Sequence, residues 1–311
     1  MIWAVSFNPC TDKTVLCEHF DEHITNRVTP LRNDLGGKAV NCALALKALG
    51  VPVTLCGMEF QGKVQTGLGE DFPTLLLETN LPLRVNLKIF DTVKKHTVEV
   101  NETGARLPEG MMEQLKTELL CRIREGDTVI LSGSLPFGEA PDTYAVWCGA
   151  LKERGAVVIA DCSGDSLHNL LKAGPDLIKP NQHELEDLLT RMGQRMPDDL
   201  KGLSLVLNAL RHQYGIRYIL CSLGKDGAIL SSDNGTYHCP PPPMEVRGDV
   251  GAGDAMTAAA AWQISMGADE TAILRLGTAA ACSVLTREGT CAPDKEIFDR
   301  LCEQVAVPRK V

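Results

Sequence analysis

Short apolar segments alternate with longer helical segments along most of the chain, and this alternation constrains the fold more than any other feature. The expected buried strands lie at 2–7, 53–56, 128–131, 157–160, 177–178 and 218–222. The expected helices lie at 142–154, 182–192, 203–214, 255–265, 269–287 and 295–305, with one more between Gly36-Gly37 and Gly50. Strands that alternate with helices form a parallel sheet covered on both faces. The sequence therefore predicts an α/β fold with a doubly wound, mainly parallel sheet.

Two groups of segments do not fit this alternation. Residues 14–34, and the pair 83–90 and 96–100, alternate apolar with polar side chains, as half-exposed strands do. The groups lie far apart in the sequence but share this character. We therefore expect a small separate sheet, built from about 12–34 and 84–102 and inserted in a single domain that spans 1–311.

The composition restricts the partners of the protein. The 311 residues carry a net charge of −9 at pH 7, which disfavours binding to nucleic acid or to an anionic membrane. No apolar run approaches the roughly 20 residues that span a bilayer, and the N-terminal segment lacks the pattern of a signal peptide. The 12 cysteines are scattered without Cys-x-x-Cys spacing. These features predict a cytoplasmic protein with reduced cysteines.

The segment Gly251-Ala252-Gly253-Asp254 stands directly before the helical run 255–265. Small residues at a helix start leave its N–H groups accessible, and these groups attract an anion together with the helix dipole. A lone Gly-x-Gly-Asp is more often a simple helix cap. The functional interpretation makes Asp254 a base beside the place where phosphoryl transfer develops negative charge.

Asn181 and Glu184 follow Lys179-Pro180 with the spacing of a capping box at a helix start. The same side-chain oxygens also suit a hydrated Mg²⁺ at the carboxyl end of a strand. The two interpretations are equally supported by the sequence.

Further glycine-bearing segments are less informative. Ser222-Leu223-Gly224 and Ser132-Gly133-Ser134 end strands, either as ordinary turns or as places where the backbone approaches a ligand. The segment 56–64 nearly matches a phosphate-binding loop. It has Val64 where the motif needs a hydroxyl that binds Mg²⁺, so we do not expect it to bind nucleotide.

Taken in order, these segments resemble the ribokinase-like (PfkB) family of carbohydrate kinases. The matching motifs are Gly36-Gly37-Lys38 with Asn41, Ser132-Gly133-Ser134-Leu135-Pro136, Lys179-Pro180-Asn181 with Glu184, Ser222-Leu223-Gly224 with Gly227, and Gly251-Ala252-Gly253-Asp254. They extend from residue 6 to about 290. Asn8-Pro9 before Asp12, and the segment 84–88, are similar to the phosphosugar branch, which includes 1-phosphofructokinase and tagatose-6-phosphate kinase.

The resemblance implies a role for each matched residue. Asp254 would accept the proton of the attacking hydroxyl, while Gly251, Ala252 and Gly253 form the anion hole for the transferring phosphoryl group. The residues implied in binding the phosphosugar are Asp12, Arg27, Gly36, Gly37, Lys38, Asn41, Arg84, Lys88, Asn101 and Ser134. Those implied at the ATP site are Lys179, Asn181, Ser222, Gly224 and Gly227, with Asn181 and Glu184 positioning Mg²⁺ through water. Many relatives also carry a site for a monovalent cation such as K⁺.

The implied activity is ATP-dependent phosphorylation of a ketohexose phosphate to the bisphosphate. Fructose 1-phosphate is the first candidate substrate, followed by tagatose 6-phosphate and fructose 6-phosphate. Arg27, Lys38, Arg84 and Lys88 are the cations that a phosphorylated substrate needs in an acidic protein. The small sheet would be the family's lid over the sugar, and a homodimer through the lid is expected. A non-catalytic sugar-phosphate sensor on the same fold is the alternative of a different class.

Three positions depart from the pattern of the phosphosugar branch. Ala39 stands where glycine is usual, Cys10-Thr11 replaces a more apolar pair, and Asp249 replaces Ser or Thr. The methyl group of Ala39 is expected to shift the sugar. The carboxylate of Asp249 is expected to alter the nucleotide or cation contacts.

Overall fold

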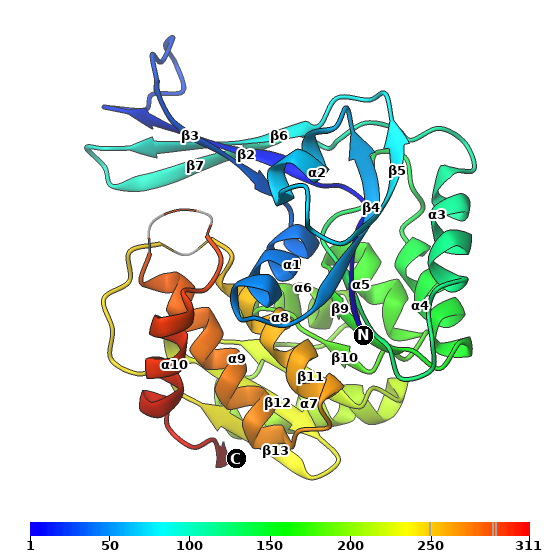
Figure 1. Ribbon diagram of the computed structural model, residues 1–311. Helices are drawn as coiled ribbons and strands as arrows, with labels where there is room; N and C mark the ends of the chain where they lie inside the picture. The colour runs from blue at the N-terminus through cyan, green and yellow to red at the C-terminus, as the bar shows by residue number, and fades with distance from the viewer. Residues whose placement is uncertain (249, 288, 290) are drawn as a thin grey trace.

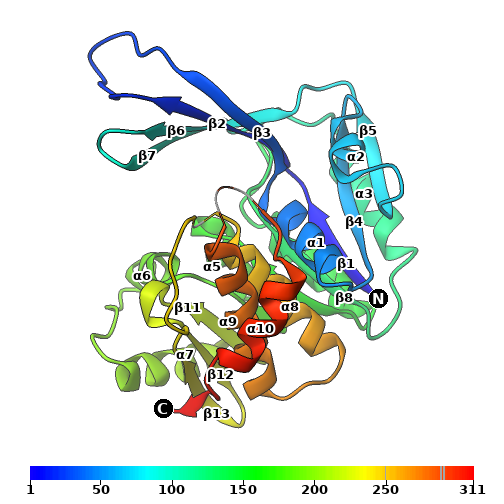
Figure 2. The same ribbon diagram turned by 60° about the vertical axis from the view of Figure 1, so that its left-hand side comes forward.

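The computed structural model describes residues 1–248, 250–287, 289 and 291–311. They form a large sheet with helices on both faces and a smaller sheet that projects from one end (Figures 1 and 2). Among the described residues, the main sheet has the strand order β14-β13-β12-β11-β10-β9-β8-β1-β4-β5. All neighbouring pairs from β11 to β5 are parallel, whereas β11 to β14 pair antiparallel. The predicted doubly wound, mainly parallel α/β fold is confirmed.

The main-sheet strands are β1 (Ile2–Ser6), β4 (Val53–Phe60), β5 (Thr74–Thr79), β8 (Thr128–Ser132), β9 (Val157–Asp161), β10 (Leu177–Ile178), β11 (Tyr218–Ser222), β12 (Ala228–Ser232), β13 (Gly235–Cys239) and β14 (Arg309–Lys310). Every residue of β1 and β8 is buried. A parallel sheet whose strands are apolar on both faces must be covered on both sides.

Two helix layers provide this cover. One layer contains α1 (Lys38–Ala48), α8 (Ala252–Ser265), α9 (Glu270–Leu285) and α10 (Lys295–Gln304). The other contains α3 (Met111–Leu120), α4 (Thr143–Glu153), α5 (Gly164–Leu171), α6 (Gln182–Arg191) and α7 (Leu200–Tyr214). A short helix, α2 (Lys63–Leu68), and a single 3₁₀ turn, η1 (Gly224–Asp226), lie in connections.

Helix α8 packs between α1 and α9 in the first layer. Its alanines from Ala258 to Ala261 are fully buried, and their small side chains let both neighbouring helices approach closely. A helix that is apolar on all sides is buried on all sides. In its first turns, the Thr257 hydroxyl donates a hydrogen bond to Asp161, the last residue of β9. The N-terminus of α8 therefore lies at the carboxyl edge of the sheet, where open α/β sheets bind ligands.

The small sheet has the strand order β3-β2-β6-β7. Its strands are β2 (Cys10–Cys17), β3 (Thr29–Gly36), β6 (Arg84–Asp91) and β7 (His96–Asn101). The two predicted groups of strands thus come together in one separate sheet. The first strand starts at Cys10 rather than Thr14, however, and 27–28 belongs to the loop before β3 rather than to a strand.

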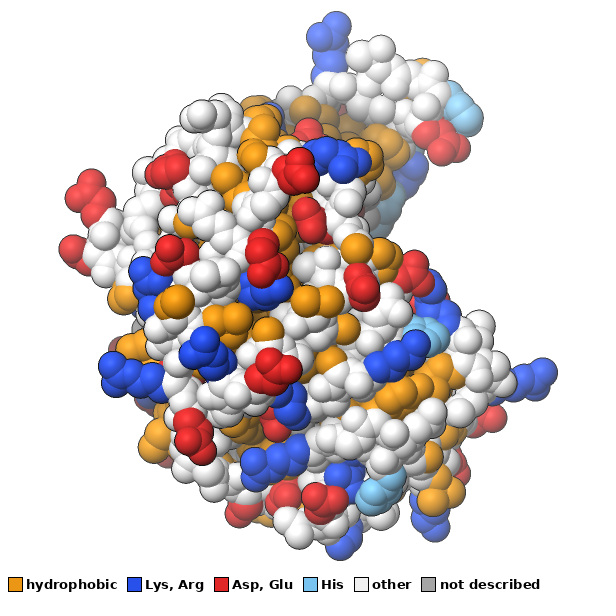
Figure 3. All heavy atoms as spheres, turned by 90° about the vertical axis from the view of Figure 1, so that its right-hand side faces the viewer, with side chains coloured by type: hydrophobic (Ala, Val, Ile, Leu, Met, Phe, Trp, Pro, Cys, Tyr) orange, Lys and Arg blue, Asp and Glu red, His pale blue; other side chains and the backbone are white. Residues whose placement is uncertain are grey.

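The two faces of the small sheet differ in chemistry. Along β6, Arg84 and Lys88 line a pocket under the sheet, whereas Leu87 and Ile89 belong to a small apolar cluster. Alternate residues of a strand point to opposite faces, so the polar face of the sheet is turned toward the main body. In the space-filling view the small sheet projects over a notch in the outline of the molecule (Figure 3).

Several elements were not predicted, among them α3, α5 and β5. Helix α3 begins after Gly110 without a side-chain cap and buries Leu115 and Leu119, so its apolar pattern is weak. Within the described part of the chain, no helix has the length and apolar character that a membrane crossing needs.

In the segment 56–64, the position where a phosphate-binding loop would hold its anion is occupied by a carboxylate of the protein itself. Glu59 is buried and accepts hydrogen bonds at 2.8 Å from the backbone N–H groups of Phe60, Val64 and Gln65. Glu59 thus occupies the N-terminus of α2, where a phosphate would have to bind. This arrangement agrees with the interpretation that 56–64 is not a nucleotide-binding loop.

Candidate active site

Two pockets adjoin at the N-terminus of α8. The first, of about 910 Å³, lies under the small sheet and includes Asp254 in its wall. The second, of about 870 Å³, is lined by Ala252 and Gly253. Asn181 lines both pockets. The N–H groups of the first turn of α8 therefore stand between two spaces, each large enough for a ligand.

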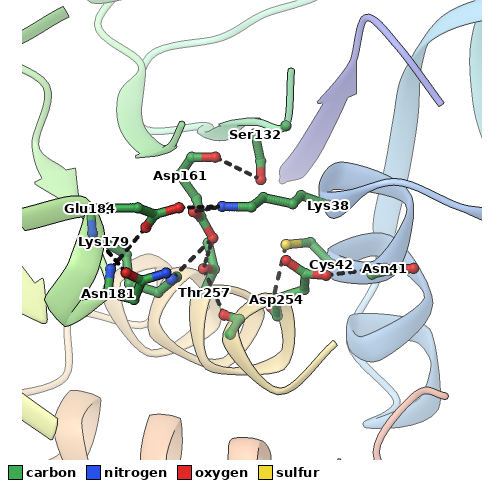
Figure 4. Close-up of polar contacts among 12 residues, drawn as sticks. Lys38, Asn41, Cys42, Ser132, Asp161, Lys179, Asn181, Glu184, Asp254 and Thr257 are labelled. Carbon is green, nitrogen blue, oxygen red and sulfur yellow. Dashed lines mark hydrogen bonds and ion pairs between the residues drawn. The ribbon is translucent and has the colours of Figure 1, made fainter. Parts of the chain in front are cut away.

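Asp254 lies in the first turn of α8 and faces α1 (Figure 4). Its Oδ2 accepts a hydrogen bond of 2.7 Å from Asn41 Nδ2. Burial of the carboxyl group and, to a smaller extent, the charge of Asp161 raise the pKa of Asp254 to about 6, against the opposing effect of Lys38. A carboxylate with a pKa near 6 is ionised at neutral pH and is a stronger base than an ordinary aspartate, as general base catalysis requires.

Asp161 was missed by the sequence analysis and is the most heavily paired carboxylate of the site. Its side chain is fully buried, with Oδ1 at 2.8 Å from Lys38 Nζ and Oδ2 at 3.2 Å from Lys179 Nζ (Figure 4). Burial alone would raise the pKa of Asp161, but the two ammonium groups hold it below its ordinary value. Asp161 therefore remains charged and fixes both lysines beside Asp254.

Lys38 begins α1 and bridges two carboxylates, since its Nζ also lies 3.2 Å from Glu184 Oε1. Burial alone would lower the pKa of Lys38, but Asp161 and Glu184 outweigh burial and raise it. The resemblance implied that Lys38 holds the existing phosphate of the sugar. In the structure Lys38 lines the first pocket, and its ammonium group is already bound to two carboxylates.

Lys179 is buried more deeply than Lys38. It is 3% exposed, and its Nζ is 3.5 Å from the point where a Cβ on Gly253 would lie. The ammonium group is therefore next to the backbone of the first turn of α8, where an anion would bind. Its place fits the expected role near the phosphates of a nucleotide.

The capping interpretation of Asn181 and Glu184 is correct. Asn181 Oδ1 accepts from the Glu184 N–H at 2.8 Å, and Glu184 Oε2 accepts from the Asn181 N–H at 2.9 Å. This box does not exclude the metal interpretation, because each oxygen keeps lone pairs for water. Among the described residues, no three His, Cys, Asp or Glu side chains converge as a metal site.

Asp12 is held from two sides in the first pocket. Its Oδ2 lies 3.2 Å from Lys88 Nζ, and its Oδ1 accepts from Asn86 Nδ2 at 3.1 Å. A Cβ on Gly36 would lie 2.6 Å from Asp12 Oδ2. The close approach that Gly36 permits is therefore to the Asp12 carboxylate, and not only to a substrate as we expected.

Arg84 lies at the start of β6 and is fixed by backbone and side-chain oxygens. Its Nε donates to the Asn8 carbonyl at 3.1 Å, and its Nη1 donates to Asn86 Oδ1 at 2.8 Å and to the Glu102 carbonyl at 2.9 Å. Ser134, which lines the same pocket, accepts a hydrogen bond of 3.1 Å from Asn8 Nδ2. Two residues implied in phosphate binding are thus both hydrogen-bonded to Asn8, to which the sequence analysis gave no role.

Most of the residues implied in phosphosugar binding meet in the first pocket. It is lined by Asp12, Gly37, Lys38, Asn41, Arg84, Lys88, Asn101, Ser134 and Asp254, with Asn8, Asn86 and Glu102 in addition. Arg27 does not reach it. This arginine is exposed in the loop between β2 and β3. It is not among the described residues that line either of the two pockets.

Most of the residues implied at the ATP site meet in the second pocket. Asn181, Ser222, Gly224 and Gly227 line it together with Ala252 and Gly253, whereas Lys179 is not among the described residues that line it. The remaining wall is largely apolar and is made by Pro241, Pro242, Pro243, Met244, Val246, Met256, Ala281, Cys282 and Leu285, with Gln182, His183, Lys225 and Thr278 as its polar members. The N–H groups of α8 stand at one end and an apolar slot at the other, which is the division that a phosphate tail and a flat base require.

The three departures lie in different places. Ala39 is fully buried in α1, and Cys10 is buried with its thiol donating to Asp12 Oδ1 at 3.4 Å. Ala39 is not among the described residues that line the first pocket, so the pocket offers no support for the expectation that its methyl group shifts the sugar. Asp249 lies outside the described residues.

Comparisons with known proteins identify the family of the chain. A model of the pfkB family of carbohydrate kinases matches residues 5–297. The 1-phosphofructokinase of Escherichia coli strain K12 is 31% identical over 94% of this chain and 93% of the relative. The 1-phosphofructokinase of Rhodobacter capsulatus is 31% identical over 98% of this chain and 97% of the relative.

Solved structures show the same fold. Phosphofructokinase-2 from Escherichia coli in complex with substrates and products has a TM-score of 0.88 and 25% identity, and the match covers 97% of this chain and 98% of that one. Ribokinase from Thermotoga maritima has a TM-score of 0.79 at 20% identity, with 97% of this chain and 99% of that chain covered. The chain belongs to the pfkB family of carbohydrate kinases. It is a sugar kinase, a phosphotransferase with an alcohol group as acceptor.

Proposed function

We propose that the protein transfers the γ-phosphoryl group of ATP to a ketohexose phosphate, with fructose 1-phosphate as the substrate and fructose 1,6-bisphosphate as the product. The observation that carries this proposal is the first pocket, which holds Arg84, Lys88 and Lys38 and ends at Asp254. In a protein with a net charge of −9, such a cluster is suited to an anionic sugar. The names of the relatives favour a phosphorylated fructose.

In this mechanism the sugar lies in the first pocket and ATP in the second. Asp254 takes the proton from the acceptor hydroxyl, because its pKa of about 6 leaves it ionised at neutral pH. The N–H groups of Ala252 and Gly253 hold the transferring phosphoryl group, and Lys179 and Lys38 stabilise its charge from the side. Asp12 and Asn41 orient the sugar hydroxyls.

Mg²⁺ fits this site as a hydrated ion. Glu184 Oε1 and Oε2 are engaged by Lys38 and by a backbone N–H, and Asn181 Oδ1 by another, so their remaining lone pairs suit waters better than direct coordination. A bound Mg²⁺ would neutralise charge on the ATP phosphates. We also propose a monovalent cation such as K⁺, because one structural neighbour was solved in complex with potassium.

We further propose that the protein assembles as a homodimer through the small sheet, which serves as the lid over the sugar. The face of the sheet turned away from the pocket carries Leu87 and Val98, and Leu31 and Val100 are largely exposed. A second copy covering this face would bury these side chains. In such a dimer Arg27, which is exposed in the loop between β2 and β3, would come near the first pocket of the other copy. Val100→Asp should convert the dimer to a monomer in analytical ultracentrifugation. Val146→Asp, at a similarly exposed valine on α4, is the control and should remain dimeric.

The substrate is tested by measuring ADP release from ATP and Mg²⁺ in a coupled assay. Fructose 1-phosphate, tagatose 6-phosphate, fructose 6-phosphate and free fructose are compared side by side. We expect the highest kcat/KM with fructose 1-phosphate and little turnover of free fructose. Preference for another phosphosugar would change the proposed substrate but would agree with the role of Arg84 and Lys88 in binding its phosphate. Turnover of free fructose alone would contradict the role of Arg84 and Lys88, and no turnover with any sugar would favour a sensor.

A further inference from the structure

Asn8 lies where three segments of chain pass between the main body and the small sheet. It belongs to the connection from β1, which ends at Ser6, to β2. Thr103 follows β7 on the way back to the main body, and Arg84 begins β6. A side chain at this point can tie the hinge of the small sheet to the fixed loops of the main body.

The contacts of Asn8 do tie these segments together. Its Nδ2 lies 3.0 Å from the Thr103 carbonyl, 3.1 Å from the Leu135 carbonyl and 3.1 Å from Ser134 Oγ. An amide nitrogen has two hydrogens, so the three acceptors share them. The backbone carbonyl of Asn8 in turn accepts from Arg84 Nε at 3.1 Å. The residue is 7% exposed, so these bonds are largely shielded from water.

The surrounding backbone leaves space for this amide and for little else. A Cβ on Gly104 would lie 2.3 Å from Asn8 Oδ1, and Gly104 has a φ of +92°, which disfavours other residues. The amide is therefore packed against the returning segment as well as hydrogen-bonded to it. Its orientation is fixed on both sides.

We propose that Asn8 is the positioning residue that sets the distance between Arg84 on the small sheet and Ser134 on the main body. Arg84 and Ser134 form the clamp for the sugar's phosphate in the proposed function, and the inference rests on that function. Asn8 contacts Ser134 through its side-chain amide and Arg84 through its backbone carbonyl. Loss of the amide keeps the bond from Arg84 to the backbone but releases Thr103, Ser134 and Leu135, so Arg84 and Ser134 are no longer held at a defined separation.

A merely structural role makes a different prediction. A buried asparagine that only stabilises the fold would lower the melting temperature and leave the KM values unchanged. Asn208 offers a matched control, because its amide donates to Thr236 Oγ1 at 3.1 Å and accepts from Ser231 Oγ at 2.9 Å, between α7 and the far strands of the main sheet. Asn208→Ala removes comparable hydrogen bonds without touching either pocket.

The kinetic test compares Asn8→Ala with Asn208→Ala in the full-length protein. We expect Asn8→Ala to raise the KM for fructose 1-phosphate about tenfold, which corresponds to about 1.4 kcal/mol, while the KM for ATP stays within about twofold. Asn208→Ala should leave both unchanged. If Asn8→Ala does not fold, Asn8→Ser keeps one donor and should give a smaller rise of the same kind. Equal rises for both substrates, or none, would overturn the proposal.

A double-mutant cycle with Ser134→Ala tests whether Asn8 acts through the clamp. If it does, Asn8→Ala/Ser134→Ala should raise the KM for the phosphosugar little more than the worse single variant. Additive effects would show that the two residues act independently, against the proposal.

Hydrogen exchange separates this inference from the proposed function, because it needs no substrate. Asn8→Ala should speed exchange of the backbone amides at 102–106 and 134–135 and leave α10 unchanged. Unchanged exchange at both segments would refute the hinge contact. Faster exchange in a protein that turns over no phosphosugar would uphold the hinge, but it would overturn both the clamp and the proposed function.

Discussion

The two pockets that adjoin at α8 are built by opposite means. In the first, charged groups from distant segments pair with one another, as Asp12 does with Lys88 and Lys38 with Asp161. The wall of the second is largely apolar and ends at the glycine-rich turn of α8. Recognition in the first pocket therefore depends on single charged groups. In the second it depends mainly on shape, and substitutions should affect one substrate without the other.

The largest effect is expected where the pockets meet. Asp254→Asn removes the base but keeps the shape and the contact with Asn41, so kcat should fall by about 10²- to 10⁴-fold. Both KM values should change by no more than a few-fold. Asp269→Asn, at the N-cap of α9 and remote from the pockets, is the matched control and should retain full activity. Wild-type turnover by Asp254→Asn would mean that another group accepts the proton.

A pair of substitutions should separate the pockets. Arg84→Met removes a guanidinium group held beside Ser134 and should raise the KM for the phosphosugar by roughly ten- to a hundredfold, since a charge-assisted contact contributes about 1.5–3 kcal/mol. Lys225→Met, in the wall of the second pocket, should raise only the KM for ATP, and by less. Steady-state kinetics with each substrate varied in turn gives both values. Effects of both substitutions on the same substrate would contradict the division.

The pH dependence of turnover should reflect the first pocket. Because burial raises the pKa of Asp254 to about 6 in the unliganded protein, kcat/KM for the sugar should fall as pH decreases through 6, by about tenfold per unit below it. The residual kcat/KM of Asp254→Asn serves as the control and should not show this step. A wild-type kcat/KM that stays flat down to pH 5 would place the base elsewhere.

The smallest effect concerns stability. The folded-state pKa of Asp254, about 6, lies above the ordinary value of 3.8, so the folded state binds more protons than the unfolded state between these pH values. The ionised carboxylate therefore destabilises the fold fully above pH 6, and less as pH falls through this window. Asp254→Asn should melt at a higher temperature than wild type at pH 7.5, with the difference shrinking toward pH 4. A lower melting temperature at pH 7.5 would show that burial of the charge is not costly.

The sequence predicted the secondary structure around the site better than the ion pairs and hydrogen bonds between its side chains. The alternation of strands and helices specified the sheet, and the glycine-rich turn placed the start of α8, because both depend on local patterns. Asp161 was missed although it follows the predicted strand 157–160 directly. A polar residue at the carboxyl end of a buried strand was a usable signal, and we had applied it to Asn181 and Glu184 but not to Asp161.

Other features depend on contacts between distant segments. The pairing of Lys38 with Asp161 and Glu184 joins residues more than 120 positions apart, so no local pattern indicates it. Asn8 is similar, since its partners Thr103 and Ser134 come near only when the small sheet has formed. Arg27 was grouped with Arg84 by the family resemblance and by charge, and the fold places it in the loop between β2 and β3, outside the first pocket.

The central claim is that a phosphoryl group passes from ATP in the second pocket to a phosphosugar in the first. The most direct measurement follows ³¹P NMR spectra of the protein with ATP, Mg²⁺ and fructose 1-phosphate, with Asp254→Asn in parallel. We predict that the ATP γ-phosphate signal declines as a second sugar phosphate signal grows in equal amount, with almost no change in the variant. Release of inorganic phosphate without a new sugar phosphate, or equal transfer by Asp254→Asn, would contradict the account.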